Sequence, residues 1–338
     1  MVTAALPQAS VLNIGFNPYG LTYTVGLQGG GTARANPEPL GLDGFIRLAH
    51  DLGARCIEVD WRWFANLSAA DLRRVAASLE GVTPVYSHWL SQRPGESLDD
   101  AIGNAAAIGA SILRLHLTPV LEGGRAAWGV RWEEMVAHAR RVLHRDSPKA
   151  AEAGLILAIE NHQDFGSEEL LAIVEELGAH AGIVFDTGNP FAVGEDPVAF
   201  ARRAAPRIRH LHLKDYVTQF TAEGFRLVRC PIGDGAVPFA EIADVLKNSH
   251  QSLTASIEPG ALEARHIRLF TPAWWDGYPP RKASELGTML GRLRGSSLAE
   301  DADTRTPWER EAPGHELIAY ERGQIRRSVE NLRGLGLL

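Results

Sequence analysis

The chain has 338 residues, of which 45% are hydrophobic, and its 34 basic and 41 acidic residues give a formal charge of −7. Because both signs are scattered along the chain, it has no basic stripe for a nucleic-acid backbone and no polybasic membrane anchor, and we expect a small substrate that is not strongly anionic. Only Cys56 and Cys230 occur, outside any CxxC or Cys/His motif, which excludes a disulfide framework and a structural zinc signature.

The amino-terminal segment MVTAALPQASVLNIGF lacks a basic start followed by a long apolar stretch. No window approaches the roughly 20 apolar residues that a membrane span needs, so we expect a cytoplasmic protein. Eight short apolar runs follow, each continuously apolar and bounded by Gly, Pro or polar turn residues, which is typical of buried parallel strands. They begin near Val11, Arg55, Thr83, Ile112, Leu155, Gly182, Ile208 and Leu253.

Amphipathic stretches separate most of these runs, with Ser or Asp near their starts and Gly near their ends as helix caps. Eight alternations of strand and helix predict an α/β fold, a (β/α)₈ TIM barrel. Three segments enlarge it: a long Gly-rich loop after the first strand, expected to fold over the barrel mouth, a hairpin insertion after the seventh, and a C-terminal helical extension. We expect one domain over residues 1–338, with the barrel at about 11–296 and the extension at about 297–338.

Four of the strands end on a residue type that binds metals. Glu160 ends LILAIE, Asp186 ends GIVFD, His212 lies in IRHLHLKD, and Glu258 ends LTASIE. Active sites of parallel barrels form at the carboxyl ends of the strands, so these four side chains are expected to converge. His210 alternates with His212 on the same strand and is expected to lie deeper, as a satisfied core histidine.

Three carboxylates and one imidazole form a hard, oxygen-rich ligand set. Such a set predicts one divalent ion, with Mn²⁺ as the first choice and Mg²⁺, Co²⁺ or Zn²⁺ as alternatives. The ion also resolves an electrostatic problem, because three carboxylates in one cavity would otherwise repel one another and take up protons.

The segments IENHQD, FDTGNP, HLHLKD and SIEPG together resemble the xylose-isomerase-like superfamily of sugar isomerases and epimerases, over about Val11 to Pro259. Each motif alone is weak, but the four in barrel order are specific. In the ketose 3-epimerase and hydroxypyruvate isomerase branches, these strand ends hold one metal ion, and two glutamates act as acid and base on opposite faces of the substrate. The resemblance implies that Glu160 and Glu258 are both ligands and proton-transfer groups, and that Asp186 and His212 are ligands.

The implied reaction is removal of the proton next to the carbonyl of a keto sugar. Returning the proton to the adjacent carbon gives isomerisation, returning it to the opposite face gives epimerisation, and expelling a β-substituent gives elimination. Where related epimerases often carry a histidine three residues after the aspartate, this chain has Asn189, a neutral candidate for substrate binding. His162 is a candidate to replace that histidine as a base or substrate donor.

The chain also resembles the large subunit of C-glycoside deglycosidases, in its length, its Gly-rich loop, the ENH triplet and the segment AWWDGYPP. Those enzymes eliminate an aglycone from 3-keto-glycosides together with a small β-sandwich partner. A β-eliminating lyase is therefore the alternative to an isomerase or epimerase, and it implies a hetero-oligomer with a small β-rich subunit instead of a homo-oligomer. A noncatalytic sugar-binding barrel is a third hypothesis, although binding alone has no need of two opposed glutamates.

Other residues near the strand ends are candidates for contact with the sugar. His116 ends the fourth strand, Trp61 and Trp89 follow or end the second and third, and Arg268 follows the eighth. Indole offers a flat apolar face for a sugar ring. No Ser/Arg/Lys cradle is evident near the last two strands, which favours an unphosphorylated substrate. Lys214 and Asp215 are expected to pair and orient their loop, with a surface ion pair as the alternative.

Overall fold

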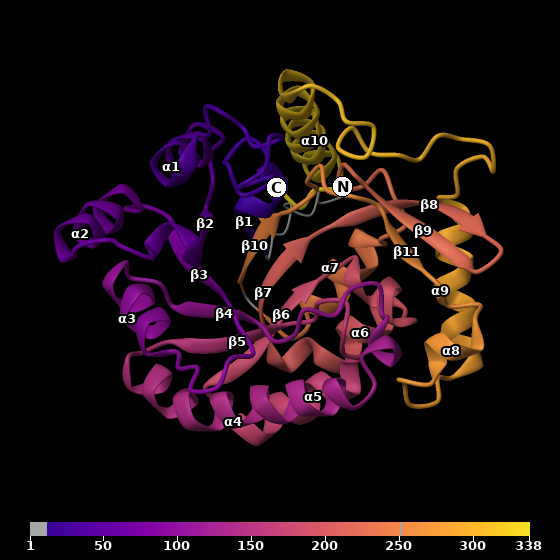
Figure 1. Ribbon diagram of the computed structural model, residues 1–338, viewed down its shortest axis with the longest axis horizontal. Helices are drawn as coiled ribbons and strands as arrows, with labels where there is room; N and C mark the ends of the chain where they lie inside the picture. Colours follow the sequence, from indigo (N-terminus) through magenta and orange to yellow (C-terminus); the bar gives the residue numbers. More distant parts are fainter. Residues whose placement is uncertain (1–11, 251) are drawn as a thin grey trace, which may run out of the picture.

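The computed structural model describes residues 12–250 and 252–338. Eight parallel strands close into a barrel in the order β1-β10-β7-β6-β5-β4-β3-β2, surrounded by helices (Figure 1). All eight predicted strands are present, and the expected start at Val11 lies outside the described residues. The barrel strands are β1 (Leu12–Phe16), β2 (Cys56–Asp60), β3 (Thr83–Trp89), β4 (Ile112–His116), β5 (Ile156–Glu160), β6 (Ala181–Asp186), β7 (Ile208–Leu213) and β10 (Leu253–Ile257).

Side-chain caps of the predicted kind are present at the starts of α2 and α6. The Ser68 side chain accepts from the Asp71 N–H at the start of α2, and the Asp196 side chain accepts from Val198 and Ala199 at the start of α6. In the part of the chain that the structure describes, no helix is long and apolar enough to cross a membrane. The α-helices are α1 (Gly41–Asp51), α2 (Ala69–Ser78), α3 (Asp99–Ala107), α4 (Val130–Glu152), α5 (Ser167–Leu177), α6 (Pro197–Ala204), α7 (Phe239–Leu246), α8 (Pro272–Trp275), α9 (Ala283–Gly295) and α10 (Gly314–Gly334), with short 3₁₀ helices η1 (Pro18–Leu21), η2 (Trp61–Phe64), η3 (Arg125–Trp128), η4 (Asn189–Val193) and η5 (Ala205–Arg207).

The predicted hairpin after the seventh barrel strand is present as β8 (Asp215–Thr221) and β9 (Gly224–Cys230). A third strand, β11 (Arg265–Ile267), pairs antiparallel with β9 and completes a small sheet beside the barrel (Figure 1). The sequence did not predict β11, because a strand of three residues with a distant partner has no periodicity of its own.

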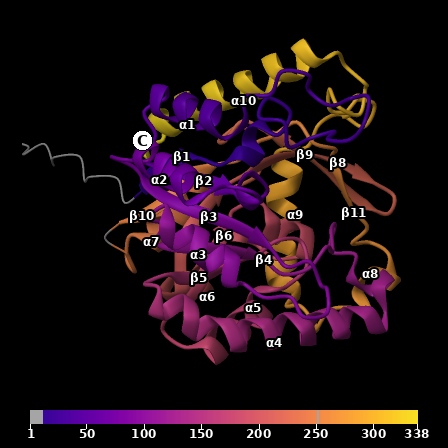
Figure 2. The same cartoon turned by 60° about the vertical axis from the view of Figure 1, so that its left-hand side comes forward.

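The C-terminal extension forms the predicted long helix, α10, which packs against the segment after β1 (Figure 2). The buried Glu321 carboxylate accepts from the backbone N–H groups of Tyr23 and Thr24, each at 2.9 Å. Ile325 and Leu332 belong to the same hydrophobic core cluster as the barrel strands. The Gly-rich loop therefore packs largely on α10, and we infer that barrel and extension are one domain.

Alternation along the strands fills the barrel interior in layers, because every second residue points inward. Val85, Ile112 and Val184, with Ala158, form a small separate apolar cluster. Two residues further along the same strands, toward their carboxyl ends, the inward residues are buried and polar: Ser87, Arg114, Glu160 and Asp186. At β1 a Cβ on Gly15 would lie 1.7 Å from the Cys56 carbonyl oxygen, so glycine is required where β1 approaches β2.

Candidate active site and metal centre

His212 lies at the centre of the predicted ligand set, at the carboxyl end of β7. Its Nδ1 is 3.0 Å from Glu258 Oε2 and 3.4 Å from Glu160 Oε1, and it makes no well-aligned hydrogen bond among the described residues. Glu160, Asp186 and His212 each offer a ligand atom within 4.8 Å of the others. The structure thus brings all four predicted ligands together, and all four are buried.

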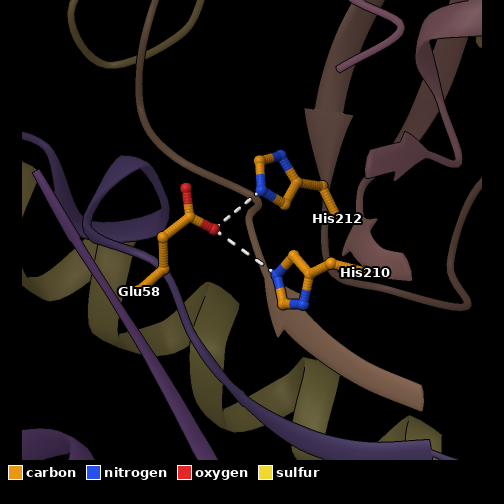
Figure 3. A group of neighbouring side chains, drawn as sticks. All are labelled: Glu58, His210 and His212. Carbon is orange, nitrogen blue, oxygen red and sulfur yellow. Dashed lines mark hydrogen bonds and ion pairs between the residues drawn. The ribbon is translucent and has the colours of Figure 1, made fainter. Parts of the chain in front are cut away.

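A fifth residue, Glu58 on β2, contacts the other ring nitrogen of His212 and so sets the orientation of the ring. His212 Nε2 lies 2.8 Å from Glu58 Oε2 (Figure 3), whereas Glu160 and Glu258 approach the other ring nitrogen, Nδ1. A carboxylate that binds the outer nitrogen of a metal-ligating histidine sets its tautomer and raises its basicity. Sequence reasoning missed Glu58, although a carboxylate inside the buried run CIEVD was an available signal.

His210 shares Glu58 with His212 but is otherwise fully bonded. Its Nδ1 lies 2.7 Å from Thr254 Oγ1 and its Nε2 3.0 Å from Ser256 Oγ, while Glu58 Oε2 is 3.4 Å away. This agrees with the expected core histidine. Glu58, His210 and His212 form a second group with metal-binding spacing (Figure 3), but both His210 nitrogens already have hydroxyl partners.

We predict that Glu58→Gln weakens Mn²⁺ binding about 10- to 100-fold, the usual effect of losing the outer carboxylate of a ligating histidine. Isothermal titration calorimetry measures it. Glu96→Gln is a matched control, since Glu96 Oε2 also contacts a histidine, His138 Nε2 at 2.9 Å, away from the site. Equal Mn²⁺ affinities in wild type and Glu58→Gln would show that Glu58 has no such role.

Asp186 is held at both carboxylate oxygens. Oδ1 accepts from the backbone N–H groups of Gly188 and Asn189, at 3.0 and 3.2 Å, and Oδ2 accepts from Lys214 Nζ at 2.5 Å. The same ammonium is 2.5 Å from Glu258 Oε1. Lys214 therefore bridges two of the four predicted ligands.

This bridge corrects the expected pairing of Lys214 with Asp215, and both residues are buried rather than on the surface. The Asp215 carboxylate instead accepts from backbone N–H groups of the turn after β9, including Gly233 and Gly235 at 2.9 Å each. Burial raises the pKa of Asp215 to about 7, although these N–H groups oppose the shift.

The site is electrostatically suited to a divalent ion. Burial alone would raise the pKa of Glu258, but Lys214 and His212 hold it well below the ordinary range, so the carboxylate is ionised. Arg114, 3% exposed, contacts Glu160 and also donates to Ser87 Oγ at 2.8 Å. Oxygen and imidazole donors with internal counter-cations fit a hard divalent metal better than a thiolate-seeking one.

Metal affinity is predicted to rise with pH up to about pH 9. Burial opposes protonation of His212, but Glu58 and Glu258 outweigh it and raise its pKa to about 9, so the ring is protonated at neutral pH. A metal ion needs the neutral imidazole, and binding releases that proton. Below pH 9 each unit should lower Mn²⁺ affinity up to about tenfold. Calorimetry from pH 6 to 9 tests this, and an affinity independent of pH over that range would contradict it.

A cavity of about 280 Å³ opens onto Glu160 and Glu258. Two of its lining side chains, Tyr19 and Trp89, stack with ring centroids 5.8 Å apart. His116 packs edge-on against Trp89, with ring centroids 5.4 Å apart, and its ring centroid lies 3.9 Å from that of His162. The cavity is lined by Tyr19, Trp89, Leu90, Arg114, His116, Thr118, Pro119, Leu121, Glu160, His162, Lys214, Arg229, Glu258, Leu262 and Arg265.

Both cavity histidines are neutral. Burial, assisted by Arg114 and Lys214, lowers the pKa of His116 to about 3, and burial with His116 lowers the pKa of His162 well below its usual value. His116 Nε2, His162 Nδ1 and Trp89 Nε1 are buried and have no hydrogen-bond partner among the described residues. These three atoms are available to a polar ligand.

Three predicted substrate contacts do not line this cavity. Trp61 lies in η2, edge-on to His88 with ring centroids 5.5 Å apart. The Asn189 side chain donates to the Asn161 carbonyl at 3.1 Å and so supports the loop behind Asp186. Arg268 is half exposed, bonds to Glu223 at 3.2 Å, and lines a separate, wider pocket with Trp274.

Comparison with known proteins finds relatives of modest similarity. The uncharacterized protein YihM of Escherichia coli is 30% identical over 145 residues, 42% of this chain and 41% of YihM. An inosose dehydratase of Bacillus anthracis is 27% identical over 157 residues, 42% of this chain and 51% of the dehydratase. The chain thus spans about half or less of these two relatives. A 3-oxo-isoapionate decarboxylase of Pectobacterium atrosepticum is 24% identical over 260 residues, which cover 70% of this chain and 86% of the decarboxylase.

Solved structures share the fold. A D-psicose 3-epimerase crystallised with D-fructose has a TM-score of 0.52 at 18% identity, covering 76% of this chain and 91% of the epimerase. A xylose isomerase-like barrel from Mycobacterium smegmatis in complex with magnesium has a TM-score of 0.51 at 16% identity, and the match covers 87% of this chain and 99% of that barrel. Residues 46–269, well over half of the sequence, match the corresponding family profile, and the chain belongs to the xylose isomerase-like TIM barrel family.

Proposed function

We propose that this protein is a divalent-metal-dependent enzyme that removes the proton next to the carbonyl of a keto sugar, with isomerisation or epimerisation as the outcome. The observation that carries the proposal is the convergence of Glu160 and Glu258 on His212 Nδ1, at 3.4 and 3.0 Å, in the wall of one cavity. Two carboxylates facing one small cavity form an acid and base pair for proton transfer.

The metal would be held by Glu160, Asp186, His212 and Glu258, and it supplies a Lewis acid that favours loss of the neighbouring proton. Mn²⁺ is our first choice, and the solved barrel from Mycobacterium smegmatis with magnesium supports a divalent metal without fixing which one. In the proposed reaction the ionised Glu258 takes the proton, and Glu160, which must enter this step protonated, returns its own proton from the other side and is left ionised beside Arg114.

The remaining cavity residues bind and orient the sugar. The stacked rings of Tyr19 and Trp89 offer an apolar face to the sugar ring. Neutral His116 and His162 can each donate or accept a hydrogen bond at a sugar oxygen, because each ring has an unpaired nitrogen. The lowered pKa of His162 makes it a weak base, which favours a role in binding the sugar over one in taking its proton.

The second candidate is β-elimination from a 3-keto-glycoside, with a small β-rich subunit as partner. Its support is the similarity to an inosose dehydratase, since dehydration next to a ketone is itself an elimination that begins with the same proton abstraction. The two candidates share the base and the cavity. They differ in whether the proton returns to carbon or a β-substituent leaves.

A substrate screen in D₂O separates the candidates. The Mn²⁺-loaded protein is incubated with ketohexoses and with 3-keto-glycosides, and NMR follows deuterium uptake and products. We expect deuterium next to the carbonyl together with an isomeric ketose. Loss of an aglycone from a keto-glycoside would instead support the lyase. Absence of metal-dependent exchange with either substrate class would refute proton abstraction as the function.

A further inference from the structure

Two arginines occupy the face of the small β8-β9-β11 sheet that looks into the cavity. Arg265 on β11 lies opposite Leu227 on β9, and Arg229 lies two residues further along β9. Because alternate residues of a strand share a face, both side chains lie on the same side of the sheet, and both line the cavity with Glu160 and Glu258.

Neither guanidinium group has a carboxylate partner in the part of the chain that the structure describes. Among residues 12–250 and 252–338, no carboxylate oxygen lies within 4.0 Å of either group, and Arg265 Nε is buried without a hydrogen bond. Arg229 is 7% exposed and donates from Nη1 to the Glu263 carbonyl at 3.0 Å. The Glu263 carboxylate itself accepts from Trp308 Nε1 at 2.9 Å.

Other buried cations near this cavity are paired. Arg114 contacts Glu160, and Lys214 lies 2.5 Å from both Asp186 Oδ2 and Glu258 Oε1. A cation shielded from water without a counter-charge is costly. Arg229 is buried and Arg265 is partly buried, and two such groups side by side in a ligand cavity, with no carboxylate at ion-pair distance, indicate a missing anion.

We propose that Arg229 and Arg265 bind an anionic group of the substrate, a carboxylate or a phosphate at the end of the sugar remote from the reacting carbons. Guanidinium groups suit this task because their N–H donors match the two oxygens of a carboxylate or phosphate. The Tyr216 hydroxyl, on the residue paired with Arg229 across the sheet, is also buried without a hydrogen-bond partner among the described residues. This proposal rests on the proposed function, since it names the substrate class of the same cavity.

The inference revises the expectation of a substrate that is not strongly anionic and not phosphorylated. The first part of that expectation came from the scattered charges of the chain, and the second from the absence of a local motif near the last two strands. The arginines are 36 positions apart by their numbers, 229 and 265, and only the β9-β11 pairing brings them together. The cavity of about 280 Å³ is small for a ligand site and favours the compact carboxylate over the larger phosphate.

Binding calorimetry with matched pairs of probes tests the anion site without any need for turnover. D-Gluconate is compared with neutral D-glucitol, and D-fructose 6-phosphate with neutral D-fructose. We expect at least one anionic probe to bind roughly 10- to 100-fold more tightly than its neutral counterpart, the usual range for hydrogen bonds to charged groups. The pair that shows the difference distinguishes a sugar acid from a sugar phosphate.

Variants identify the residues. Arg229→Gln and Arg265→Gln should each remove most of the anionic advantage, and Arg265→Lys should restore part of it. Arg226→Gln is the control, since Arg226 lies on the opposite face of β9 and pairs with Glu309 at 3.0 Å. Equal binding of anionic and neutral probes, or an advantage that survives both glutamine variants, overturns the proposal. Proton exchange on neutral ketoses would still support the proposed function, so the two failures are distinct.

Discussion

Replacing Glu160 or Glu258 by glutamine is expected to lower kcat by about 10²- to 10⁴-fold at saturating Mn²⁺, the usual contribution of a positioned general acid or base. Glutamine keeps the shape and the oxygen ligand of glutamate but cannot exchange a proton. The loss should therefore exceed any change in KM. The Glu96→Gln variant, which changes a buried glutamate outside the site, should retain wild-type kcat.

The two variants should also differ from each other in D₂O. If Glu258 takes the proton and Glu160 returns it, Glu160→Gln still incorporates deuterium into the substrate but forms little product, whereas Glu258→Gln does neither. NMR measures both quantities in one sample. Circular dichroism is needed alongside, because Glu160→Gln leaves the buried Arg114 without its carboxylate partner. Retention of wild-type kcat in both folded variants would contradict the assignment.

Chelation is expected to abolish activity while the protein stays folded. The buried carboxylates keep internal counter-cations without a metal, since Lys214 bridges Asp186 and Glu258 and Arg114 contacts Glu160. Metal at about 100 times its Kd would add only about 2.7 kcal/mol to the free energy of unfolding. Far-UV circular dichroism should therefore change little on adding EDTA, and added Mn²⁺ should restore turnover.

Lys214→Met sharpens this prediction. Without the bridging ammonium, the carboxylates of Asp186 and Glu258 repel each other unless a metal ion is present. The variant should then lose much more thermal stability on chelation than the wild type does. Full activity of the chelated wild type, or its complete unfolding, would contradict the account.

The sequence predicted the barrel and the convergence of four strand-end side chains because both depend on local patterns. Continuous apolar runs identify buried strands, and the parity of each strand decides that Glu160, Asp186 and His212 point inward. The fourth predicted ligand, Glu258, follows from the same rule. This is why the four side chains converge in the structure as expected.

The parts that sequence reasoning missed depend on contacts between distant segments. In the sequence, Glu58 is a single carboxylate in an apolar run. Its contact with His212 becomes evident only when the fold places β2 across the barrel from β7. Trp61 follows a barrel strand, but the 3₁₀ turn of η2 directs it toward His88 instead of the cavity. Tyr19 reaches the cavity from the loop after β1, and no local pattern distinguishes it from the rest of that loop.

The most direct test of the central claim is a crystal structure of the Mn²⁺-loaded protein with an anomalous difference map at the manganese edge. The account predicts one peak per chain, on the Nδ1 side of His212 and ligated by Glu160, Asp186 and Glu258, with Lys214 displaced from these carboxylates. A peak within the Glu58, His210 and His212 group, or no peak at saturating Mn²⁺, would contradict it.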